Sequence, residues 1–193
     1  MVMWLLRYGI TRKLIYNISK NVRNTGTYVR DAKHLEELCC IARQSGRIML
    51  DTEFVMDRTQ RPKLCLVQIG IDSETPKLLD PFRISLNALQ ELMIDGNVTK
   101  VFHDGSIDLP LLCPDAPPKN IFDTQIAASI IGMYWQTGYA TLLKNLLGVK
   151  LDKAMQCSNW KARPLSASQE QYALNDVIHL FDVHDALQTR LKV

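Results

Sequence analysis

The chain has 193 residues, of which 47% are hydrophobic and 22% charged, and this composition excludes fibrous, collagen-like and wholly disordered proteins. A chain of this length forms about one domain, with or without an extension, and can bury a sizeable core without disulfides. No apolar run approaches the roughly 20 residues that a membrane-spanning helix needs, so we expect no membrane span. The five cysteines, an odd number without a C-x-x-C spacing, argue against a disulfide framework or structural zinc and favour a reducing compartment.

The net charge of +3 is unevenly distributed along the chain. Residues 1–30 hold six basic and no acidic side chains, whereas residues 31–193 hold 17 basic and 20 acidic ones. An acid-free, amphipathic start that contains arginine is typical of mitochondrial targeting segments. A packed N-terminal helix is one alternative, and a basic arm that contacts nucleic acid or a ribonucleoprotein partner is another. Without targeting, we expect a cytoplasmic protein.

From Asp31 onward the pattern predicts a single α/β domain. In chain order we expect a helix over 31–45, strands over 47–54, 63–71 and 77–79, a helix over 84–94, strands over 99–103 and 121–122, and helices over 123–132, 138–147 and 168–190. The polar turn between the first two strands predicts an antiparallel hairpin. This order indicates a mixed β-sheet flanked by helices, and the ribonuclease H-like fold fits it.

Two acidic residues lie close together on the first predicted strand. Asp51 and Glu53 are two residues apart, so both side chains leave the same face of the strand. Two carboxylates at the end of a buried strand repel each other and lose solvation, and a divalent cation offsets both costs. A solvent-facing pair at the strand end is the alternative, and these two residues alone favour it.

Later in the chain, three further polar residues stand at positions where helices are predicted. Asp108 follows the fourth strand at a helix start, where the helix dipole alone favours an acid and where Asp104 competes for any role. Tyr172 and Asp176 are four residues apart on the last helix and share a face with Leu180, which turns that face toward the core. A phenol and a carboxylate that point inward are unusual, although a tyrosine can also satisfy its own hydrogen bond at the rim of a core.

The order of these motifs is more informative than any one of them. Asp-x-Glu on an early strand, Asp after a later strand and Tyr-x-x-x-Asp on a late helix resemble the DEDDy 3′–5′ exonucleases. Several segments of about residues 31–190 resemble ribonuclease D in particular: 51–54, 58–69, 103–109, 123–128 and 160–177. Five residues before Asp176, where relatives such as oligoribonuclease carry His, this chain has Gln171. The resemblance is therefore to the Tyr-type enzymes.

The resemblance implies a ribonuclease H-like exonuclease domain over 31–193, without the HRDC domains of bacterial ribonuclease D. It also implies hydrolysis with two divalent ions, Mg²⁺ or Mn²⁺. Asp51 would bridge both ions, Glu53 and Asp176 would complete the site of the attacking water, and Asp108 would support the second ion. Tyr172 would orient the water, and the product would be a 5′-nucleoside monophosphate.

Three more residues are candidates for nucleic-acid binding. His103 ends a strand beside Asp108, although an ordinary hydrogen-bonded histidine is the simpler interpretation. Lys161 and Arg163 can hold phosphate or can belong to a solvated turn before a proline. We expect Trp160 in the core and Asp123 as a helix cap.

The resemblance favours an exoribonuclease that acts on the 3′ ends of single-stranded RNA and matures or trims small RNAs. A DNA 3′–5′ exonuclease shares the same motifs and is one alternative. A non-catalytic structural or RNA-binding subunit of a ribonucleoprotein is the other, and the presence of all five motif residues disfavours it.

Overall fold

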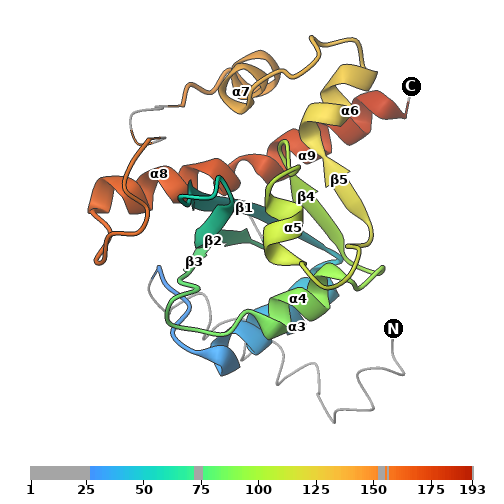
Figure 1. Cartoon of the computed structure of the whole chain (residues 1–193). Coiled ribbons are helices and arrows are strands. Elements are labelled where there is room, and N and C mark those ends of the chain that lie inside the picture. The colour runs from blue at the N-terminus through green and yellow to red at the C-terminus, as the bar shows by residue number, and fades with distance from the viewer. Residues whose placement is uncertain (1–26, 72–75, 152–154, 156, 193) are drawn as a thin grey trace.

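The structure is a computed structural model that describes residues 27–71, 76–151, 155 and 157–192. Most of the basic N-terminal segment lies outside these residues, so the predictions of a targeting segment or an arm stay predictions. Figure 1 shows a central sheet with helices on both sides. The strands are β1 (Arg47–Met56), β2 (Pro62–Gly70), β3 (Lys77–Leu79), β4 (Thr99–Phe102) and β5 (Ile121–Asp123). The helices are α3 (Ala32–Ser45), α4 (Asn87–Met93), α5 (Asp108–Leu112), α6 (Thr124–Ile130), α7 (Tyr139–Leu147), α8 (Ala167–Ile178) and α9 (Leu180–Leu191).

The sheet is mixed, as predicted. Its strand order is β3-β2-β1-β4-β5, which places β1 at the centre. β1 pairs with β2 in antiparallel orientation and with β4 in parallel orientation. β3 extends the antiparallel half and β5 the parallel half. The predicted hairpin of the first two strands and the α/β, ribonuclease H-like class are thus confirmed.

Alternation along β1 sends its side chains to two different cores. Ile48 and Leu50 pack with helices α3 and α4 on one face of the sheet. Met49 points to the other face, where it packs with Val177 of α8 and Leu180 of α9. Figure 1 shows α3 and α4 on the side of the sheet away from α8 and α9. Asp51 continues the series of Met49, so the alternation directs its carboxylate toward α8.

The last predicted helix, 168–190, is wrong in one respect, because the structure divides it at His179. Helix α8 ends at Ile178 and α9 begins at Leu180, and His179 has φ −97° and ψ −4°. The two halves differ in their main partners: α8 packs on β1, β2 and β3, whereas α9 packs chiefly on α6 and α7 and also contacts β4. Since no glycine or proline marks the division, the tertiary packing sets it and periodicity could not reveal it.

Three other features bear on the predictions made from the sequence. Strand β1 continues to Met56, so Asp51 and Glu53 lie within the strand and not at its end. All five cysteines are free, as expected. Within the described part of the chain, no helix combines the length and apolar character needed to cross a bilayer.

Candidate active site

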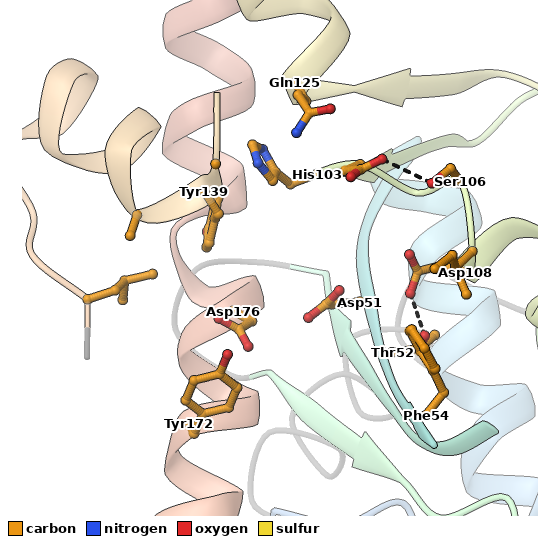
Figure 2. A pocket seen from close by; sticks show the side chains of 15 residues that line it. Asp51, Thr52, Phe54, His103, Ser106, Asp108, Gln125, Tyr139, Tyr172 and Asp176 are labelled. Carbon is orange, nitrogen blue, oxygen red and sulfur yellow. Dashed lines mark hydrogen bonds between the residues drawn. The ribbon is translucent and has the colours of Figure 1, made fainter. Parts of the chain in front are cut away.

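Three of the predicted acids meet at the centre of the sheet. Asp51 and Glu53 leave β1 on the face covered by α8, and Asp176 projects from α8 onto the same place. One carboxylate oxygen from each lies within 4.8 Å of the others. Figure 2 shows Asp51 and Asp176 facing each other across a cavity. The fold therefore brings together residues that are 125 positions apart in the sequence.

Asp108 reaches this cavity from the opposite side of β1. Thr52, which alternates with Asp51 and Glu53, donates a hydrogen bond from its hydroxyl to the Asp108 carboxylate. Asp108 is the first residue of α5 and is buried, with 6% of its surface exposed. It lies outside the group of three acids but borders the same cavity of about 360 Å³. The lining residues are Asp51, Thr52, Phe54, His103, Asp104, Ser106, Ile107, Asp108, Gln125, Gly138, Tyr139, Ala140, Leu151, Tyr172 and Asp176.

The surroundings of these acids disfavour their ionised forms. Burial, and then the carboxylates of Asp176 and Asp108, raise the pKa of Glu53 to about 9. Burial raises the pKa of Asp176 to about 7. Burial and the neighbouring acids also hold the pKa of Asp51 well above its usual range. None of the ion pairs found among the described residues involves Asp51, Glu53 or Asp176.

A divalent cation fits this arrangement. Converging carboxylate oxygens are the ligands that hard cations such as Mg²⁺ prefer, and positive charge offsets the repulsion that raises these pKa values. A second observation comes from Gln68, which lies directly opposite Asp51 on β2. Its amide is buried and makes no hydrogen bond to the described residues, so its donor and its acceptor remain available to a ligand of the site. Asp51, Glu53 and Asp176 would hold the ion.

Tyr172 belongs to the same cavity. It lies one helical turn before Asp176 on α8, and Figure 2 shows its hydroxyl pointing toward the Asp176 carboxylate. Its ring lies 6.0 Å from the ring of Trp160, which is buried in the core as predicted. Burial and the nearby acids hold the pKa of Tyr172 above its usual range, so at neutral pH the phenol is a hydrogen-bond donor.

His103 also lines the cavity, and the Thr124 hydroxyl holds its ring. The hydroxyl of Thr124 donates to the carbonyl oxygen of Phe102, at 3.0 Å. The same hydroxyl lies 3.0 Å from Nδ1 of His103 and is therefore free to accept a hydrogen bond from an Nδ1–H group. In this neutral tautomer Nε2 is an acceptor. Asp123 caps α6, as predicted, by accepting from the backbone N–H groups of Gln125 and Ile126.

Comparison with known proteins gives the same picture as the geometry. Residues 27–192 match a family model described as 3′–5′ exonuclease. The chain belongs to the 3′–5′ exonuclease family. Among curated relatives, ribonuclease D of Granulibacter bethesdensis is 39% identical over 175 residues, which cover 86% of this chain and 43% of the relative.

Solved structures agree with this membership. Escherichia coli RNase D, described as an exoribonuclease involved in structured RNA processing, superposes with a TM-score of 0.80 at 34% identity, over 87% of this chain and 45% of that one. Brucella melitensis NrnC with bound Mg²⁺ superposes with a TM-score of 0.67 at 30% identity, over 78% and 76% of the two chains. The exonuclease domain thus spans less than half of the ribonuclease D chains that it matches.

Two of the candidate nucleic-acid ligands lie outside the cavity of the exonuclease domain. Lys161 is exposed on a turn. The guanidinium of Arg163 pairs with Asp80 at 2.7 Å and donates to the carbonyl oxygens of Trp160 and Cys65. Asp80 is 4% exposed, and this arginine helps to hold its pKa below the usual range. The described contacts of Arg163 therefore give it a structural role, and phosphate binding by either residue stays a prediction.

We expect Arg163→Ala to lower the free energy of unfolding by about 3 kcal/mol, because it leaves the buried Asp80 carboxylate with only the exposed guanidinium of Arg83, 3.5 Å away, as an ionic partner. Urea unfolding of the metal-free domain measures this. Lys161→Ala, two residues away and exposed, is the matched control and should change stability by less than about 0.5 kcal/mol. Unchanged stability of Arg163→Ala with weakened RNA binding would instead assign Arg163 to phosphate.

Sequence reasoning missed two residues of the cavity. Tyr139 and Gln125 both line it. Tyr139 lies outside the segments that resemble ribonuclease D, whereas Gln125 lies within one of them, 123–128, without a role of its own having been predicted. Tyr139 is the first residue of α7, and Gln125 lies in the first turn of α6. No signal in a single sequence distinguishes such positions from ordinary helix starts, since only the packing of α6 and α7 over the sheet brings them to the cavity.

Proposed function

We propose that this domain is a 3′–5′ exoribonuclease that hydrolyses single-stranded RNA to 5′-nucleoside monophosphates. The observation that carries the proposal is the meeting of Asp51, Asp108, Asp176 and Tyr172 around one cavity, with Glu53 converging on Asp51 and Asp176. Family membership supports the class of reaction, and the ribonuclease D relatives support RNA as substrate. Maturation or trimming of small RNAs is the process we infer.

The four carboxylates suit this chemistry through their placement. Two ions, Mg²⁺ or Mn²⁺, when bound, neutralise the phosphate oxygens and lower the pKa of water. Asp51 lies between the Glu53–Asp176 side of the cavity and the Asp108 side, so it is positioned to serve both ions. The Thr52 hydroxyl holds Asp108 in place and leaves its other oxygen for the second ion.

Tyr172 has a positioning role in this proposal. Its phenol stays protonated, so it cannot take a proton from water, but it can hold a water molecule or a phosphate oxygen in line for attack. We expect Tyr172→Phe to lower kcat by about 10²-fold with little change in KM. Steady-state kinetics in Mg²⁺ measures both values. Tyr28→Phe is the matched control, because that phenol bonds Glu170 outside the cavity; an equal kcat for Tyr172→Phe and wild type would remove Tyr172 from the mechanism.

The proposal is tested on labelled strands. A 5′-labelled single-stranded RNA and the DNA of the same sequence are incubated with Mg²⁺ or Mn²⁺ and with EDTA. We expect the RNA to shorten progressively from its 3′ end, and EDTA to stop the reaction. Degradation of DNA alone would favour the DNA exonuclease. The absence of degradation of either strand, together with retained RNA binding, would favour the non-catalytic subunit.

A further inference from the structure

The N-terminus of α7 is uncapped and opens onto the catalytic cavity. Its N-cap residue is Gly138, which has no side chain to accept from the helix. The carbonyl oxygen of Gly138 accepts from Thr141 and Leu142, at 2.9 and 3.0 Å. No hydrogen bond among the described residues uses the backbone N–H groups of Tyr139 and Ala140. Free N–H groups and the positive end of the helix dipole together attract anions.

A buried hydroxyl gives independent support for a ligand at this place. The hydroxyl oxygen of Tyr139 is inaccessible to solvent and finds no hydrogen-bond partner among the described residues. The ring is fixed by packing 5.2 Å from the ring of His103. Figure 2 shows Tyr139 at the edge of the cavity, above Asp176. A buried polar group without a partner is costly, so a ligand that accepts its hydrogen bond repays that cost.

The chemistry of these groups selects a phosphate. Burial, followed by the carboxylates of Asp176 and Asp51, raises the pKa of Tyr139, which therefore remains a donor. The backbone N–H groups beside it are donors as well. Among the described residues that line the cavity there is no lysine or arginine, so the donors that they offer to a phosphate are neutral.

We propose that the N-terminus of α7 and the Tyr139 hydroxyl form a binding site for the phosphodiester group directly 5′ of the scissile one. The inference rests on the proposed function. An enzyme that releases 5′-mononucleotides cleaves at the phosphate of the terminal nucleotide itself, so every other phosphate of the substrate lies on the 5′ side. Asp51, Glu53 and Asp176 would hold ions that bind the scissile phosphate. The N-terminus of α7 binds the neighbouring phosphate, which fixes the strand in register for the next cleavage.

The first test removes the charge of the phosphodiester 5′ of the scissile one and, separately, the Tyr139 hydroxyl proposed to bind it. An RNA with a methylphosphonate at the linkage 5′ of the scissile bond is compared with the unmodified RNA. We expect kcat/KM of wild type to fall by about 10-fold or more on the modified RNA, and Tyr139→Phe to lose a similar factor on the unmodified RNA. When Tyr139→Phe acts on the methylphosphonate RNA, the two losses in kcat/KM should not multiply, because both changes remove the same interaction. Losses that multiply fully would overturn the assignment of Tyr139.

The second test fills the helix cap. Gly138 has φ −68°, which any residue adopts, and a β-carbon added there meets no atom within 4 Å. We expect the neutral cap of Gly138→Asn to raise Tm by about 2–4 °C relative to Gly138→Ala, because its side chain accepts from the free N–H groups. The same variant should become insensitive to the methylphosphonate, whereas Gly138→Ala should keep the sensitivity of wild type. A Gly138→Asn enzyme with wild-type sensitivity would overturn the assignment of α7.

These tests separate this inference from the proposed function. If wild type fails to shorten the unmodified RNA, the proposed function fails first. If wild type shortens modified and unmodified RNA at equal rates, the exonuclease stands and the phosphate site at α7 is excluded.

Discussion

We expect Asp51→Asn to reduce kcat/KM on single-stranded RNA by at least about 10³-fold, because loss of this ligand removes several kcal/mol of transition-state stabilisation by metal. Asp51 is the acid placed between Glu53, Asp176 and Asp108, so its loss affects both sides of the cavity. The same change should raise the Tm of the metal-free protein, since a neutral amide replaces a buried carboxyl that its neighbours repel.

A matched control for Asp51→Asn lies in the same cavity. Asp104 is exposed and outside the group of three converging acids, and Asp104→Asn should retain kcat/KM within about twofold. Activity assays and thermal melts of both variants test the expectation. Retained activity of Asp51→Asn would contradict the role of Asp51 as a metal ligand. A loss of activity together with a lowered Tm would not report on metal binding.

The second large effect is the dependence of stability on pH and metal. Folding raises the pKa of Glu53 to about 9 and that of Asp176 to about 7, so the folded metal-free protein binds more protons than the unfolded chain. The stability that these two groups contribute is present at about pH 4 and is lost as the pH rises through 7 and then 9. The lowered pKa values of His103 and His184 act in the opposite direction below about pH 6.5, and that of Lys100, about 8, does so above pH 8. We therefore expect the Tm of the metal-free protein to fall most clearly between about pH 7 and pH 8.

Mg²⁺ should reverse this trend, because it binds the ionised carboxylates and so has a higher affinity at higher pH. The increase in Tm on adding Mg²⁺ should be larger at pH 8.5 than at pH 6. Thermal melts at both pH values, with and without EDTA, measure the effect, and Glu53→Gln is the control that should flatten the pH dependence. A Tm that is independent of pH without metal would show that the carboxylates are already compensated.

Much of the fold and site could be predicted from the sequence because the signals were local or were carried by motif order. The period-2 spacing of Asp51 and Glu53 and the one-turn spacing of Tyr172 and Asp176 each place side chains on one face. The structure confirms that the two residues of each pair share a face, and it shows that the face of β1 and the face of α8 lie against each other. The order of strands and helices likewise sufficed for a mixed sheet, since its hairpin and its parallel crossover follow from short and long connections.

Other features depend on contacts between distant segments, which a single sequence does not display. The division of the last helix at His179 follows from two packing partners. The pairing of Arg163 with Asp80 joins positions 83 residues apart and changes how the role of Arg163 is viewed. Tyr139 became a candidate only because its hydroxyl lies buried beside acids from β1 and α8.

The attack of water on the phosphorus of the 3′-terminal nucleotide is the central claim, and the most direct test is product analysis in ¹⁸O-labelled water. Wild-type protein, Mg²⁺ and single-stranded RNA are incubated in this solvent, and the released nucleotides are analysed by mass spectrometry. We expect 5′-nucleoside monophosphates that carry one ¹⁸O on the phosphate, and none with EDTA. Nucleoside 3′-phosphates or 2′,3′-cyclic phosphates, or 5′-monophosphates without ¹⁸O, would contradict it.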